Sequence, residues 1–160
     1  MEKITKQIKI IEDPIISPNY RNALDNTAEH YRLMITFVQE QMIENIDYGV
    51  IPGSKNPTLF KAGAEKLCRL FSLRPTFDVV DSIVDFDKPL FHYHYRCSLY
   101  RSGELVGSAD GSCNSFESKY RKQQHKAFDL PNTICKMAQK RALITAVLAS
   151  CGASEFFNQT

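Results

Sequence analysis

The amino-acid sequence predicts an α+β protein: N-terminal helices, then a three-stranded antiparallel meander, then a C-terminal helix packed on the sheet (a β-β-β-α core). Three observations predict this fold. Apolar residues recur at helical spacing before residue 50, and β-branched and aromatic residues are frequent over 77–113. Residues 138–149 are rich in alanine, which favours a helix. The chain has 160 residues, 43% apolar and 24% charged, which suits one domain with a hydrophobic core. We assign 1–20 to a flexible N-terminal arm and 21–160 to a single α+β domain.

The first predicted helix follows the arm, which contains Pro14 and Pro18 and shows no sustained period. From residue 24, apolar side chains recur at steps of four and three, which predicts a helix of about six turns ending near Asp47. This apolar stripe consists of Leu24, Ala28, Tyr31, Ile35, Val38 and Met42. The stripe suits core packing, and the same spacing also forms seams between subunits.

The later elements follow from turn signals and composition. Glycines and a proline in 48–53 indicate a turn that leads into a second helix over 59–71. Strands are expected at 77–86, 91–100 and 104–113, the last two joined as a hairpin across 101–103. After a polar, basic connector over 114–130, Asn132 suits the N-cap of a helix that runs to Ser150 and stops at Gly152.

The cysteines and the hydropathy pattern bear on the cellular setting. Five cysteines, an odd number without Cys-x-x-Cys spacing, argue against a disulfide framework or a zinc site, so we expect buried, unbridged thiols. No apolar run approaches the roughly 18 residues of a membrane span, and 1–11 lacks the apolar stretch of a signal peptide. We expect a soluble, cytoplasmic protein with no membrane association.

Charge is distributed unevenly along the chain. Residues 12–50 carry seven acidic and two basic side chains, whereas 116–141 carry seven basic and two acidic ones. The connector mixes cations with aromatic and amide side chains, a mixture that suits phosphates and bases. The candidate nucleic-acid-binding residues are Lys119, Tyr120, Arg121, Lys122, Lys126, Lys136, Lys140 and Arg141, with Tyr120 as a stacking platform. The alternative is a basic loop and helix face in contact with water alone.

A family resemblance adds to this interpretation. The tetrad Lys140-Arg141-Ala142-Leu143, in a helix that follows a meander and ends in glycine, resembles the single-strand annealing superfamily, which includes the eukaryotic annealing mediator and phage Erf-type recombination proteins. Residues 64–71 and 77–81 resemble that family's helix and first strand, and 106–111 its glycine-containing third strand. The resemblance implies a ring-shaped or helical homo-oligomer, no nucleotide cofactor, and Lys140 and Arg141 lining a single-strand groove. Ile144 stands where the family tends to carry a further arginine.

We therefore expect single-stranded DNA binding and strand annealing in phage-type homologous recombination, by a chain that is not an enzyme and needs no cofactor. Holding a strand with its phosphates neutralised and its bases exposed lowers the barrier to pairing.

Two other functions stay open. Glu117-Ser118-Lys119 has the Glu-x-Lys form of Mg²⁺-dependent nucleases, in which Asp110 or Asp87 would supply a second carboxylate. The second alternative is a small phage-type inhibitor that binds a host protein. His92 and His94 point to one side of a strand but lack a third ligand, so we expect no metal site.

Overall fold

A computed structural model describes the chain except for residues 1–17, 53, 55, 124–127 and 159–160. The chain divides into two compact units, Met1–Gln41 and Met42–Thr160. In the first unit the structure describes helix α1 (Pro18–Gln41). Most of the predicted arm therefore lies outside the described residues, and its last three residues are helical.

Helix α1 ends earlier than the apolar stripe predicts, so the predicted end near Asp47 is wrong. Asn45 adopts the left-handed conformation, with φ of 66°. The Ile43 amide donates to the Asp47 carboxylate at 2.8 Å, and the Asn45 amide donates to the Tyr48 carbonyl at 2.7 Å. A left-handed residue and a local side-chain acceptor both favour a turn over a further helical turn.

The second unit begins with a small sheet where the sequence predicted only a turn. Strands β1 (Tyr48–Gly49) and β2 (Thr58–Leu59) pair antiparallel and lead into helix α2 (Lys61–Leu70). The buried Asp47 carboxylate accepts from the Lys66 ammonium as well as from the backbone. This ion pair holds the chain before β1 against α2.

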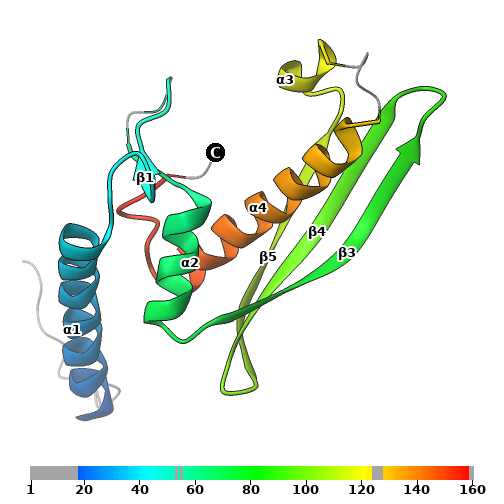
Figure 1. The fold of residues 1–160 in the computed structure, drawn as a ribbon. Coiled ribbons are helices and arrows are strands. Elements are labelled where there is room, and N and C mark those ends of the chain that lie inside the picture. Colours follow the sequence, from blue (N-terminus) through cyan, green and yellow to red (C-terminus); the bar gives the residue numbers. More distant parts are fainter. Residues whose placement is uncertain (1–17, 53, 55, 124–127, 159–160) are drawn as a thin grey trace, which may run out of the picture. The chain divides into compact units, whose positions relative to one another are not determined.

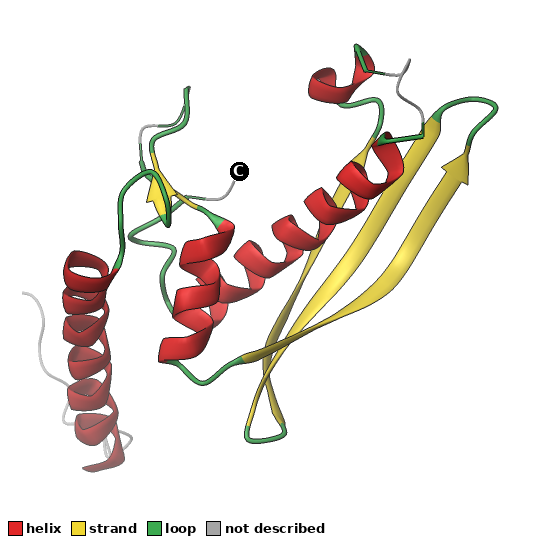
Figure 2. Cartoon of the chain, in the orientation of Figure 1, coloured by secondary structure: helices red, strands yellow, loops and turns green. Residues whose placement is uncertain are grey.

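The three-stranded antiparallel sheet confirms the predicted fold class (Figure 2). Its order is β3-β4-β5, from β3 (Arg74–Asp85), β4 (Leu90–Arg101) and β5 (Glu104–Asn114). Strands β4 and β5 are joined by Ser102 and Gly103, which have φ of 53° and 88°. Two successive positive φ values are those of a type I′ turn, whose twist matches that of the strands.

Helix α4 (Leu130–Ser150) follows the sheet and begins before the predicted cap. The N-cap is Asp129, so the prediction that Asn132 caps the helix is wrong. The helix accommodates Pro131 in its first turn, where the missing N–H needs no partner. The predicted stop is confirmed. Gly152 has φ of 63°, and the Ala153 amide donates to the Leu148 carbonyl at 2.9 Å, as in a Schellman motif.

Helix α4 packs on β5 and β4 and barely touches β3 (Figure 1). Its approach to β5 depends on Gly111, where an added Cβ would lie 2.2 Å from the Ala142 nitrogen. Because the helix leaves β3 uncovered, large apolar side chains of this edge strand and the turn after it stay exposed. They are Phe77, Val79, Val80, Ile83, Val84 and Phe86.

The five cysteines all lie within the described residues, and none forms a disulfide. Four are buried, as predicted. Burial raises the pKa of Cys68 to about 11 and that of Cys97 to about 12, so these thiols stay protonated near neutral pH. Separately, each helix in the described part of the chain is too short or too polar to cross a bilayer.

Candidate functional site

A groove of about 900 Å³ lies between α2, the start of β3 and α4. Pro75 and Phe77 line it from β3, while α2 and α4 contribute residues on either side. The groove exists because α4 packs over β4 and β5 and leaves the adjoining face of β3 open. All of these elements belong to the second unit.

Four basic side chains line this groove: Lys61 and Arg69 from α2, and Lys136 and Lys140 from α4. Lys136 and Lys140 are one helical turn apart and so share a face of α4. Glu65 is the one acidic lining residue and pairs with Lys61 at 3.4 Å. Among the described residues, no carboxylate lies within ion-pairing distance of Arg69, Lys136 or Lys140. The groove therefore carries positive charge that its own carboxylate does not neutralise.

Lys140 lies in an environment that disfavours its positive charge. Partial burial, followed by the positive charges of Lys119 and Arg141, lowers the pKa of its ammonium. Removal from water and like charges both disfavour the protonated amine. An anion placed beside Lys140 would favour the protonated amine and offset the repulsion from the neighbouring cations.

The groove also has an apolar floor. Phe77 is 37% exposed, Pro75 is half-buried, and Leu73 and Leu143 are buried. Met137 is half-buried and also lines the groove. The groove thus combines unneutralised cations with a surface that water solvates poorly.

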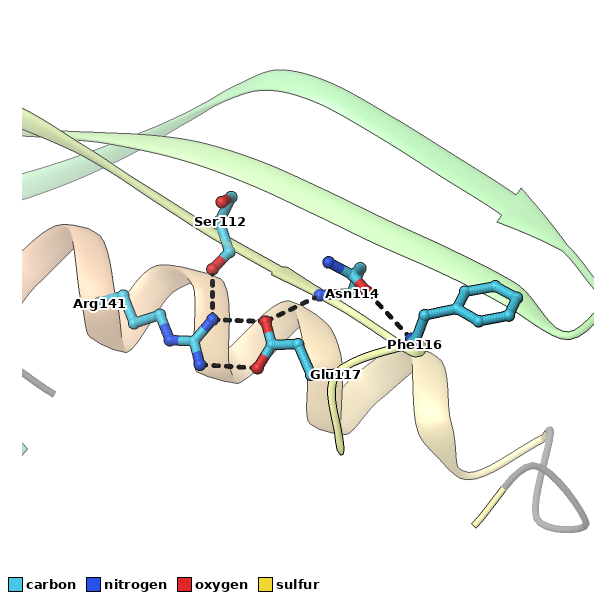
Figure 3. Close-up of polar contacts among 5 residues, drawn as sticks. All are labelled: Ser112, Asn114, Phe116, Glu117 and Arg141. Carbon is cyan, nitrogen blue, oxygen red and sulfur yellow. Dashed lines mark hydrogen bonds and ion pairs between the residues drawn. The ribbon is translucent and has the colours of Figure 1, made fainter. Parts of the chain in front are cut away.

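Arg141 does not lie among the groove-lining residues, and its role as a phosphate contact stays a prediction. Its guanidinium makes a bidentate ion pair with the Glu117 carboxylate at 2.6 and 2.8 Å and donates to the Ser112 carbonyl at 2.7 Å (Figure 3). Only 31% of the Arg141 side chain is exposed. A guanidinium with these acceptors is a structural link between α4, the end of β5 and the following turn.

Glu117 is held in the same network. The Arg141 guanidinium is the main cause that lowers the pKa of the Glu117 carboxyl group. The backbone N–H of Asn114 donates to the Glu117 carboxylate at 3.3 Å, and the backbone N–H of Phe116 donates to the Asn114 side-chain oxygen at 2.9 Å (Figure 3). These bonds fix the turn into helix α3 (Ser118–Arg121). This short helix lies within the segment that the sequence predicted to be a connector.

Tyr120 cannot be the stacking platform that the sequence suggested, because it is only 2% exposed. It is a buried residue of α3, and the Lys119 ammonium lies 5.5 Å from the centre of its ring. A solvent-facing base cannot reach a buried ring. The aromatic residues of this region that do face solvent are Phe116 and Phe128, 44% and 88% exposed.

The other candidate cations fall into three groups. Lys136 and Lys140 line the groove, and Lys119 is close enough to Lys140 to depress its pKa. Arg121 and Lys122 are exposed at the end of α3, outside the groove lining. Lys126 lies outside the described residues.

The groove residues that α2 contributes were not among the site residues predicted from the sequence. Lys61, Glu65 and Arg69 recur every four residues, which places them on one face of a helix. That spacing could have identified a charged face. Only the packing of α2 beside α4 shows that this face lies across from Lys136 and Lys140.

Asp110, one candidate for the second carboxylate of the nuclease hypothesis, does not lie beside Glu117 in the structure. Asp110 forms a bidentate ion pair with Arg96 and also contacts His94 at 3.2 Å. It alternates with Gly111, which faces α4, so it points to the opposite face of β5 from Arg141 and its partner Glu117. Within the described ranges, no group of three or more His, Cys, Asp or Glu side chains is placed to hold a metal ion.

Comparisons with protein-family models, with curated proteins and with solved structures found no significant match to this chain.

Proposed function

We propose that this chain binds single-stranded nucleic acid, in the first place DNA, in the groove between α2, β3 and α4. The observation that carries the proposal is the combination of cations on both walls with an apolar floor. Cations attract phosphates by displacing condensed counterions, and apolar or aromatic surface attracts unpaired bases. A single strand presents both groups at once, whereas a duplex keeps its bases paired inside.

Strand annealing is the finer part of the proposal. Two complementary strands repel each other through their phosphates, and a protein that neutralises those charges lowers the barrier to their encounter. The chemistry requires no covalent step and no cofactor. The setting suggested by the family resemblance, phage-type homologous recombination by a homo-oligomer, belongs to the same proposal.

Direct binding measurements test the proposal. Fluorescence anisotropy of a labelled single-stranded oligonucleotide should report binding at low salt, and the same sequence as a duplex should bind more weakly. Affinity should fall by orders of magnitude between roughly 50 and 200 mM salt if several phosphates are contacted. Gel analysis of the same samples with and without Mg²⁺ shows whether the strand stays intact.

Three outcomes speak against the proposal in different ways. Absence of single-strand binding at low salt would contradict the proposed function. A flat salt dependence would contradict the role of the cations in binding phosphates. Cleavage that requires Mg²⁺ replaces annealing with the nuclease alternative.

A further inference from the structure

We infer that the groove is a nucleobase site, in which unpaired bases lie against Phe77 while their phosphates stay at the cationic edges. The inference rests on the proposed function and specifies which part of a single strand the groove floor recognises. It differs from the expectation that every base of a bound strand points outward.

The floor favours a base over a phosphate. Phe77 and Pro75 both lie on the face of β3 that α4 leaves uncovered, and 37% of the Phe77 surface is open. A phosphate pressed against this surface would lose water without gaining a hydrogen-bond donor from it. A base would lose little water and would gain a stacking contact.

The cations are placed to hold phosphates away from the floor. The side chains of Lys61, Arg69 and Lys136 are exposed although their residues line the groove. Long basic side chains commonly pack their aliphatic stems on apolar surface and keep the charged ends in water. Lys140 is half-buried and adds positive charge deeper in the same wall.

The size of the groove limits how much of a strand it can cover. Its lining residues on α4 run from Asn132 to Leu143, a helical rise of about 17 Å. At roughly 3.4 Å per nucleotide of a stacked strand, this length accommodates about five nucleotides. Bases beyond the groove remain exposed, so a longer strand can be held at one place and still pair elsewhere.

Abasic DNA separates base recognition from phosphate recognition. Anisotropy should be measured with a labelled oligothymidylate and with an abasic oligodeoxynucleotide that has the same number of phosphates, at the same salt. Wild-type protein should bind the abasic strand at least about tenfold more weakly, because stacking of each base typically strengthens binding about five- to 150-fold.

Variants of β3 locate the effect. Phe77→Ala should weaken oligothymidylate binding about tenfold and leave binding of the abasic strand unchanged, whereas Phe77→Tyr, which keeps the ring, should bind as wild type does. Val79→Ala is the matched control, since Val79 lies two residues further on the same strand face, is 57% exposed and does not line the groove. Circular dichroism spectra confirm that each variant is folded.

The outcomes distinguish this inference from the proposed function. Equal affinity of wild-type protein for the two strands would show that bases do not contact the floor, and would overturn the inference while single-strand binding stands. Binding of neither strand would remove the proposed function itself. An unequal affinity that Phe77→Ala leaves unaltered would place base recognition elsewhere and would also overturn the inference.

Discussion

The Arg141 guanidinium and the Glu117 carboxylate form a bidentate ion pair, at 2.6 and 2.8 Å, that joins helix α4 to the turn before α3. Arg141 follows Lys140 directly in the sequence, yet these two neighbours have different roles. Lys140 lines the groove, and Arg141 holds the framework beside it. This division of roles gives separate expectations for stability and for binding.

Arg141→Gln should lower the free energy of unfolding by about 1–3 kcal/mol, because the Glu117 carboxylate and the Ser112 carbonyl lose a charged donor. Lys140→Gln should leave the free energy of unfolding nearly unchanged and should weaken oligonucleotide binding. Urea titrations followed by circular dichroism measure the first effect, and anisotropy the second. The assignment is wrong if Arg141→Gln is as stable as wild type and loses binding.

The same ion pair predicts how stability depends on pH. Arg141 lowers the pKa of Glu117 in the folded protein, so the unfolded chain binds a proton at higher pH than the folded protein does. The stabilisation is fully present above the unfolded pKa of roughly 4.3 and is lost as the pH falls through the lowered folded pKa. Thermal unfolding of wild type and Glu117→Gln at a series of pH values measures this pH-dependent stabilisation. The stability difference between them should shrink towards acidic pH, and a constant difference would contradict the account.

Much of the fold follows from local sequence signals, whereas the groove does not. The Ser102-Gly103 turn and the Gly152 stop depend on a few adjacent residues, and both are found where the sequence placed them. Tyr120 was assigned from its place in the basic connector and Arg141 from the tetrad, whereas the burial of one and the pairing of the other depend on segments far away in sequence. No local pattern reveals that a charged face of α2 lies across from α4.

The close packing of α4 on β5 can be tested at two glycines. Gly111→Ala should destabilise the protein by about 1–3 kcal/mol, because the new methyl group would meet the backbone of α4. Gly107→Ala is the matched control on the same strand, where the nearest atom is the Ser150 hydroxyl, which can rotate away. Urea denaturation should show a larger loss for Gly111→Ala. Equal losses would mean that the helix can shift away from the sheet.

The exposed edge strand β3 bears on the proposed homo-oligomer. Long apolar edge strands are liabilities unless they are covered. We expect light scattering to give a mass above the 18.3 kDa of one chain at micromolar concentration. Val79→Lys with Ile83→Lys should reduce that mass, because charged residues on an edge oppose pairing with another strand. A monomer with and without DNA would contradict the ring.

The central claim, that the groove between α2, β3 and α4 holds single strands, is tested most directly by removing two of its cations. Lys136→Ala with Lys140→Ala should weaken single-strand binding at low salt at least about tenfold and make the logarithmic salt dependence shallower by about 1.4, the share of two phosphate contacts.

The matched control is Arg74→Ala with Arg101→Ala. This pair removes the same charge from exposed positions outside the groove, with Arg74 on the opposite face of β3 from Phe77. The control should retain nearly wild-type affinity and salt dependence. If the two double variants lose affinity equally, binding reflects net charge alone; if neither loses affinity, the groove does not hold the strand. Either result would contradict the account.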